Sequence, residues 1–169
     1  INESDTFIEI ATTRPETMLG DTAIAVNPND KRYKALIGKT ALLPLVGRRI
    51  PIIADDMVDP EFGTGCVKIT PAHDLNDYEV GIKHNLEIIN IMNADSSISD
   101  KAPKKYRGMS REAARKQIVS DLKDTNYLIK EEDYLHKVGY SERGNVPIEY
   151  YLSEQWFLKM EDLAKPASK

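Results

Sequence analysis

The segment that most constrains this chain is 63–79, GTGCVKITPAHDLNDYE. Two glycines precede a short apolar run that carries one lysine, Lys68, and a proline ends the run. A helix start follows, with Asp74 and Asp77 three residues apart, and residues at this spacing share a helix face. We therefore expect both aspartates to lie beside Lys68 and the hydroxyl of Thr70. A cation, a hydroxyl and two carboxylates at a strand end predict a polar pocket.

Composition excludes several classes of protein. The chain has 169 residues and a net charge of −4, which allows one domain with a core and provides no basic field for non-specific nucleic-acid binding. Cys66 is its one cysteine, which excludes an internal disulfide and favours a reducing compartment. No apolar run approaches the roughly 20 residues that span a bilayer. We expect a cytoplasmic protein without membrane partners and, because the chain begins with Ile1, a domain taken from a longer protein.

Hydrophobic periodicity predicts many short strands separated by turns. The expected strands are 6–13, 23–26, 67–70, 87–92, 127–129 and 135–141, with a hairpin over 40–46 and 48–54. The expected helices are 29–37, 74–84 and 110–124. Pro44 and Pro51 indicate sheet edges or bulges, because proline cannot donate to a ladder. The polar segment 93–106 is expected to be an exposed loop.

The fold class that follows is α+β. Many strands without regular helix alternation favour a mostly antiparallel, β-barrel-like core with two or three flanking helices, and argue against a doubly wound parallel sheet. We assign residues 1–143 to this domain and residues 144–169 to a C-terminal arm that ends in a short amphipathic segment.

Asp74 and Asp77 have two interpretations. Both can serve the helix, since aspartate is favoured as an N-cap and in the first turn. Alternatively, one of them escapes capping and binds a cationic group such as an α-ammonium. Lys68 does not decide between them: an unpaired buried lysine is costly, but an ion pair with either aspartate fits both interpretations.

A second polar segment lies at 11–17, ATTRPET. It is either a hydroxyl-rich turn with a surface ion pair between Arg14 and Glu16, or a polar cradle. In the cradle, the hydroxyls of Thr12 and Thr13 would orient a water or a ribose, and Arg14 would fix a phosphate or a base edge.

Three further residues were considered as site residues. Cys66 has no base near it in the sequence, so we expect a small buried residue rather than a nucleophile. His73 directly adjoins an aspartate, which is not the spacing of helical metal ligands, and we predict no metal site. Phe62, beside the glycine turn, is either a core residue or a platform for a base. P-loop, GxGxxG and GxSxG motifs are absent from the sequence.

Three motifs together resemble valyl-tRNA synthetase, specifically its inserted editing domain, connective peptide 1. They are ATTRPETMLGD at 11–21, GTGCVKITPAHDLNDYEVG at 63–81 and SEQWFLKM at 153–160. Isoleucyl enzymes have a TTTPWT-like run at the first motif, and leucyl enzymes usually follow TTRP with aspartate, so Glu16 and the segment 68–70 favour the valyl type. The HIGH and KMSKS motifs of the catalytic domain are absent. The resemblance therefore implies an isolated editing domain that does not activate amino acids.

The resemblance implies hydrolysis of the ester in threonyl-tRNA(Val), at a site that reads the threonine hydroxyl because a hydrophobic pocket rejects such an isostere only weakly. By this resemblance Asp77 holds the α-ammonium and Asp74 accepts the threonine hydroxyl. Arg14 and Phe62 seat the terminal adenosine. The implied catalytic residues are Asp77, Lys68, Thr70, Thr12 and Thr13, and the implied substrate-binding residues are Asp74, Asp77, Arg14, Phe62, Glu16 and His73. No enzyme nucleophile is evident, so we expect attack by a bound water.

Editing implies no cofactor or metal, whereas the parent enzyme uses ATP and Mg for aminoacylation. The implied partners are the acceptor end of tRNA(Val) carrying threonine and the parent's catalytic domain, and the isolated domain is expected to be a monomer. Three alternatives stay open: a passive module that holds the acceptor end, a metal hydrolase, and the editing domain of an isoleucyl or leucyl enzyme. We also expect replacement of Lys68 by alanine to lower activity with little loss of stability.

Overall fold

A four-stranded sheet forms the centre of the domain. The computed structural model describes residues 7–167. The strands are β1 (Ala23–Val26), β2 (Thr40–Leu42), β3 (Arg49–Ala54) and β4 (Cys66–Ile69), in the order β2-β3-β1-β4. β1 runs parallel to β3 and antiparallel to β4, and β2 is antiparallel to β3. The sheet is therefore mixed, with mostly antiparallel pairing as predicted.

The sheet is open, so the prediction of a β-barrel-like core was wrong. Within residues 7–167, β2 and β4 are edges with one neighbour each. The strands that we expected at 7–13, 87–92, 127–129 and 135–141 do not form there, and Thr6 lies outside the described residues. Two isolated bridges are found instead, Met92 with Ile98 and Tyr140 with Pro147. Apolar and β-branched residues predicted these strands, but without partner strands no closed sheet can form.

The helices that carry clear capping signals are confirmed. α1 (Leu75–Lys83) has Asp74 as its N-cap, and α2 (Arg111–Asp124) has Ser110. The helix expected at 29–37 is reduced to turns and the short 3-10 helix η2 (Lys34–Leu36). A second 3-10 helix, η1 (Pro15–Gly20), precedes β1, and α3 (Met160–Ala167) ends the described chain.

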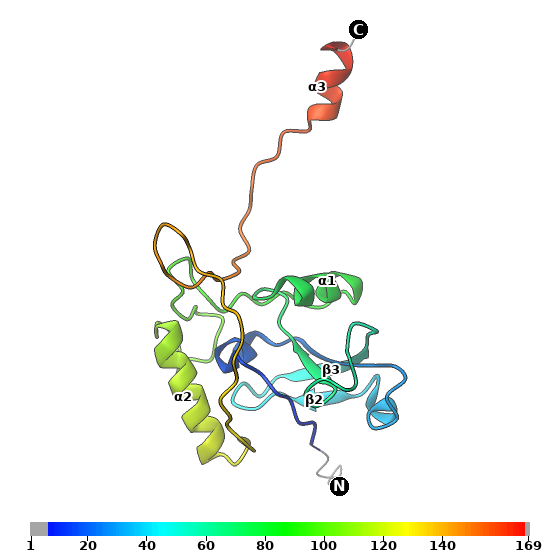
Figure 1. The fold of residues 1–169 in the computed structure, drawn as a ribbon, viewed down its shortest axis with the longest axis vertical. Helices are drawn as coiled ribbons and strands as arrows, with labels where there is room; N and C mark the ends of the chain where they lie inside the picture. The colour runs from blue at the N-terminus through cyan, green and yellow to red at the C-terminus, as the bar shows by residue number, and fades with distance from the viewer. Residues whose placement is uncertain (1–6, 168–169) are drawn as a thin grey trace.

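β1 is buried on both faces and divides the core into two clusters. Successive strand residues point to opposite faces. The face with Ile24 and Val26 joins the larger cluster, to which α2 contributes Ile118. The face with Ala23 and Ala25 joins a smaller cluster, to which α1 contributes Val80 and β4 contributes Ile69. Figure 1 shows α1 and α2 at separate places around the sheet.

Two local predictions need correction. Pro51 lies in β3, which has neighbours on both sides, and not at a sheet edge. Its missing N–H is tolerated because the parallel ladder with β1 begins only at Ile52. The segment 93–106 lacks helix and strand as expected, but it is not fully exposed, since Ile98 and Tyr106 belong to the core at 1% and 2% exposure.

The C-terminal arm differs from the domain in that its large apolar side chains are exposed. Trp156 and Phe157 are each at least 90% exposed. In Figure 1 the chain extends away from the domain to α3. No helix within residues 7–167 is long and apolar enough to span a membrane. The boundary that we predicted at residue 143 stays a prediction.

Candidate functional site

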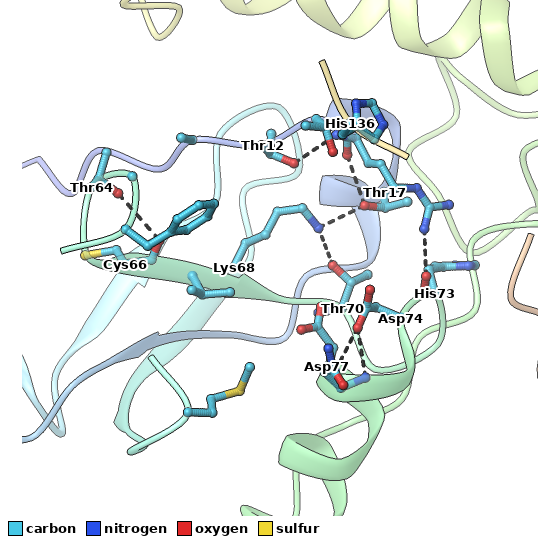
Figure 2. A pocket seen from close by; sticks show the side chains of 18 of the residues that line it. Thr12, Thr17, Thr64, Cys66, Lys68, Thr70, His73, Asp74, Asp77 and His136 are labelled. Carbon is cyan, nitrogen blue, oxygen red and sulfur yellow. Dashed lines mark hydrogen bonds between the residues drawn. The ribbon is translucent and has the colours of Figure 1, made fainter. Parts of the chain in front are cut away.

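One cavity, with a volume of about 510 Å³, gathers most of the predicted site residues. Its walls come from the segment before η1, the glycine turn, β4, the start of α1 and the segment between α2 and the arm (Figure 2). The predicted residues that line it are Thr12, Thr13, Arg14, Phe62, Lys68, Thr70, His73, Asp74 and Asp77. Glu16 is not among the lining residues. The two polar segments singled out in the sequence therefore meet at one site.

Lys68 is the centre of a closed polar network on the cavity floor. Its ammonium donates to Thr17 Oγ1 at 2.8 Å, to Asp21 Oδ1 at 3.1 Å and to Thr70 Oγ1 at 2.5 Å. Figure 2 shows the Lys68 side chain reaching toward Thr17 and Thr70. An ammonium has three N–H donors, so all of them are committed to the protein. The expected ion pair of Lys68 with Asp74 or Asp77 was wrong, because Asp21 is its partner.

Asp21 is a buried acid that depends on this network. It is 2% exposed, and its Oδ1 also accepts the Thr70 hydroxyl at 2.5 Å. Burial raises the pKa of the Asp21 carboxyl, and the Lys68 ammonium opposes that rise. Loss of Lys68 would leave the acid buried without its cation, so the structure gives Lys68 a positioning role in the fold of the site.

Asp77 is a buried acid with one oxygen tied to the fold. It is 7% exposed, and its Oδ2 accepts the backbone N–H of Thr70 at 2.8 Å. Burial, helped by the carboxylates of Asp74 and Asp21, raises its pKa to about 6 against the opposing effects of the Thr70 N–H and Lys68. No group within residues 7–167 donates a hydrogen bond to its Oδ1. A cationic group in the cavity would therefore find an unused carboxylate oxygen at Asp77.

One carboxylate oxygen of Asp74 caps α1, and the other has no hydrogen-bond donor in residues 7–167. Its Oδ1 accepts the backbone N–H groups of Asn76 at 2.9 Å and Asp77 at 3.2 Å, which caps α1. Its Oδ2 accepts no hydrogen bond from the described part of the chain. Asp74 is therefore the cap, whereas Asp77 accepts the Thr70 N–H and does not cap the helix. Ligand binding by either acid stays a prediction.

Arg14 is fixed at the cavity wall by groups from both sides. Its Nη1 donates to the His73 carbonyl at 2.7 Å, and its Nη2 pairs with Glu149 of the arm. Its Nε lies 3.5 Å from Glu16 Oε1. Glu16 is 2% exposed and also lies 3.5 Å from Arg115, so its position is behind Arg14 and not in the cavity lining.

His73 contributes mainly to the fold. Its ring is 1% exposed, and Nε2 accepts the backbone N–H of Ile91 at 3.0 Å. Burial, together with the positive charges of Arg14 and Lys68, lowers the pKa of His73 to about 4. The imidazole is therefore neutral near pH 7. The backbone carbonyl of His73, and not its ring, orients Arg14.

The glycine turn shapes the outer wall of the cavity. Gly65 has φ +74°, and a Cβ there would lie 3.0 Å from the Pro60 carbonyl oxygen, so only glycine fits. Phe62, in the same turn, is 68% exposed and lines the cavity, which rules out the core interpretation. Cys66 is 5% exposed and burial raises the pKa of its thiol, as expected for a structural cysteine.

Sequence reasoning missed four residues of the site. Thr17 and Asp21 complete the Lys68 network, and their inclusion in the motif at 11–21 was a signal that could have found them. Tyr134 and His136 line the cavity from the segment between α2 and the arm, with ring centroids 6.0 Å apart. Nothing in their sequence context indicated this position. Among residues 7–167, no group of three or more His, Cys, Asp or Glu side chains could hold a metal ion.

Comparison with known proteins identifies the family. The family model described as leucyl-tRNA synthetase, editing domain, matches residues 34–132. The chain belongs to this editing-domain family. It is 60% identical over 163 residues to valine–tRNA ligases of Staphylococcus aureus, from strain bovine RF122 / ET3-1 and from strain Newman. Each match covers 96% of this chain and 18% of the relative, so the chain spans less than a fifth of those proteins. The predicted resemblance is confirmed.

Two solved structures share the fold of this editing domain. The first is the agnB2 LeuRS–tRNA–LeuAMS ternary complex of Agrobacterium radiobacter K84, with a TM-score of 0.55 and 23% identity over 72% of this chain and 18% of that one. The second is GlLeuRS-CP1, with a TM-score of 0.56 and 15% identity over 75% of this chain and 83% of that one. At these identities the likeness concerns the fold alone.

Proposed function

We propose that this editing domain hydrolyses the ester bond of threonyl-tRNA(Val), releasing threonine and free tRNA. The observation that carries the proposal is the pair of acids, Asp74 and Asp77. Both line the cavity together with Arg14, and each has one carboxylate oxygen that accepts no hydrogen bond from residues 7–167. Two acids at one cavity match the two groups that distinguish a threonyl ester, an α-ammonium and a β-hydroxyl. The 60% identity to valine–tRNA ligases supports threonine as the amino acid to be removed.

Asp77 is suited to the α-ammonium. With a pKa of about 6 it is mostly ionised near pH 7, and its burial strengthens attraction to a cation. Asp74 then accepts the threonine hydroxyl through Oδ2. Valine has no hydroxyl, so its ester would leave this acceptor without a partner in the site, and an unpaired buried polar group is costly.

Water is the proposed nucleophile. The thiol of Cys66 is buried, and the Thr70 hydroxyl already donates to Asp21. Water attacks the ester carbonyl and the carbon–oxygen bond to the terminal ribose breaks. The proton that the water loses ends on the ribose oxygen, so the products are threonine and free tRNA. The Thr12 hydroxyl accepts the backbone N–H of Arg14 at 3.0 Å, which leaves its own proton to donate to the ester or to the attacking water. Thr12 and Thr13 are therefore the proposed catalytic hydroxyls, and Lys68 and Thr70 the positioning residues.

The terminal adenosine and the parent enzyme complete the proposal. Phe62, exposed at the cavity wall, would stack on the adenine, and Arg14 would bind a phosphate or the base edge. The partners are the acceptor end of tRNA(Val) and the catalytic domain of the parent synthetase, to which the arm 144–169 would lead. The reaction needs no cofactor or metal, so hydrolysis should be unchanged in the presence of a chelator.

Incubation of the chain with threonyl-tRNA(Val) and with valyl-tRNA(Val) tests the proposal. We expect the threonyl ester to decay faster than in buffer and faster than the valyl ester. The matched variant is Asp77→Ala: loss of hydrolysis with RNA binding retained supports an enzyme. Equal decay of both esters, at the rate in buffer, would instead indicate a module that only holds the acceptor end. A loss of hydrolysis in chelator would indicate a metal hydrolase.

A further inference from the structure

Glu149 of the arm bridges two arginines that come from distant parts of the chain. One carboxylate oxygen pairs with Arg14 Nη2 and the other with Arg111 Nη1. All three side chains are partly buried, with exposed fractions of 28% for Arg14, 19% for Arg111 and 16% for Glu149. One oxygen on each guanidinium is the arrangement that two non-bridging oxygens of a phosphodiester would make.

Both arginines are positioned without Glu149. Arg14 is held by the His73 carbonyl at 2.7 Å and by Glu16 at 3.5 Å. Arg111, the first residue of α2, donates from Nε to Glu112 at 3.0 Å. The Nη groups that face Glu149 are therefore preorganised donors that converge on one place, and preorganisation lowers the cost of binding an anion there.

The charges around this place balance only while one anion is present. The positive groups are Arg14, Arg111 and Arg115, and the negative groups are Glu16, Glu112 and Glu149. Without Glu149 three positive charges face two negative ones, an excess of one. A phosphodiester carries one negative charge, so exchange of Glu149 for a phosphate leaves the balance unchanged.

Glu149 belongs to a segment that can leave more easily than the arginines can. It lies in the arm, outside helix and strand, and its neighbours Ile148 and Tyr150 are 58% and 53% exposed. Arg111 is anchored in α2, whose Ile118 is fully buried. The arm therefore supplies an anion, Glu149, that can be replaced. The two arginines that bind it are held in place by contacts within the domain.

We propose that Arg14 and Arg111 form a binding site for a backbone phosphate of the RNA acceptor end, and that Glu149 occupies this site until RNA displaces it. The proposal deepens the proposed function, on which it rests for the identity of the ligand as RNA. Because Arg14 also lines the cavity, a phosphate held there would direct the 3′ end of the RNA toward Asp74 and Asp77.

The test measures binding of an RNA hairpin with the four unpaired 3′ nucleotides of a tRNA acceptor end and no amino acid attached. Glu149→Gln keeps the shape of the side chain and removes its charge, so we expect binding about five- to tenfold tighter. Arg111→Gln should weaken binding about tenfold and lower the slope of log K against log salt by about 0.7, as for one lost contact to a single strand. The matched controls are Glu142→Gln, just before the arm, and Arg49→Gln on β3, both exposed, and we expect no change for either.

Two further arms decide the origin of the effect. In the double variant Glu149→Gln/Arg111→Gln, the gain from Glu149→Gln should disappear. A hairpin with neutral methylphosphonate linkages at its 3′ end should bind the wild-type and Glu149→Gln chains equally. Unchanged or weaker binding by Glu149→Gln, or no binding by any variant, would overturn the inference and make Glu149 a brace for the arm.

The hairpin carries no ester, so its binding does not depend on hydrolysis. If threonyl-tRNA(Val) is hydrolysed but the Glu149 and Arg111 variants bind like wild type, this inference fails and the proposed function stands. If the variants behave as expected but no ester is hydrolysed, the phosphate site stands and the proposed function fails.

Discussion

The floor and the rim of the cavity use charge in different ways. On the floor, Thr17, Asp21 and Thr70 accept all three N–H donors of Lys68, so no donor of this ammonium remains for a ligand. On the rim, one carboxylate oxygen of Asp74 accepts hydrogen bonds from the start of α1, and one of Asp77 accepts the N–H of Thr70 at the end of β4. The second oxygen of each acid accepts no hydrogen bond from residues 7–167. Loss of a floor charge should therefore reduce stability, and loss of a rim charge should reduce function.

The largest effect is expected on the floor. Lys68→Ala leaves Asp21 buried without a cation, and breaking a buried ion pair in this way costs about 3–5 kcal/mol of unfolding free energy. Urea denaturation measures it, with Lys39→Ala, an exposed lysine, as the control within about 0.5 kcal/mol of wild type. The structure thus reverses the expectation from sequence that Lys68→Ala would spare stability. A Lys68 variant as stable as the Lys39 variant would contradict the distinction between floor and rim.

Asp77→Asn should give the opposite result. Its folded pKa of about 6 lies above the usual 3.8, so the fold favours the protonated acid. The stability contributed by that proton is present below about pH 3.8 and is lost as the pH rises through about 6, by at most roughly 3 kcal/mol. Asparagine removes this loss and can still accept from the Thr70 N–H. At pH 7 the variant should be as stable as wild type or more so, while hydrolysis falls about 100-fold because the α-ammonium loses its counter-charge.

Urea denaturation at pH 4 and pH 7 measures the stability part of the Asp77 prediction. The control is Asp124→Asn, an exposed acid at the end of α2. If the unfolding free energies of the wild-type chain and the Asp77 variant depend on pH in the same way, the fold does not raise the pKa of Asp77. If the variant loses stability and activity together, Asp77 stabilises the fold as Lys68 does, and its role in binding a ligand is not supported.

Phe62→Ala should weaken RNA binding and spare the fold. Stacking of a base on an aromatic ring is worth about 1–3 kcal/mol, so affinity for the acceptor-end hairpin should fall about 5- to 150-fold. Because Phe62 is 68% exposed, the unfolding free energy should change by less than about 0.5 kcal/mol. Phe157→Ala, in the arm and 90% exposed, is the matched control. Equal affinities of the two variants would remove Phe62 from the site.

The smallest effect is expected for Asp74→Asn. Asparagine is also a good N-cap, so α1 should keep its stability, whereas Asp74→Ala should cost about 1 kcal/mol. Loss of the charged acceptor should reduce the preference for threonyl over valyl ester about tenfold, more than it reduces the hydrolysis of either. Rates on both esters measure this. A proportional fall in both rates would mean that Asp74 does not read the hydroxyl.

Local signals in the sequence predicted the elements that carry the site. The cap at Asp74, the glycine turn at 63–65 and the apolar run of β4 each act within a few residues, and α1 and β4 form where expected. The segment 135–141 was also predicted to be a strand, but no strand forms there. A strand forms only when it pairs with another strand, and the sequence of one segment does not show whether such a partner lies beside it in the fold.

The charge pairing of the site could not be predicted from local sequence. Asp21 follows η1 and reads as an ordinary residue after a glycine, yet it pairs with Lys68 across 47 positions. Arg14 and Glu149 are 135 positions apart. Such pairs depend on how the segments pack, so the sequence indicated many of the residues that line the cavity but not which of them pair with one another.

The central claim is that Asp77 keeps one oxygen for the α-ammonium of a threonyl ester. Carbon-13 NMR of the Asp77 carboxyl, followed from pH 3 to pH 8 in the free chain and with a non-hydrolysable amide-linked threonyl-adenosine, tests it directly. We predict a pKa of about 6 in the free chain and a clear fall of that pKa with the threonyl analogue, because a bound cation favours the ionised acid. An unchanged pKa with the analogue bound at saturation would contradict the account.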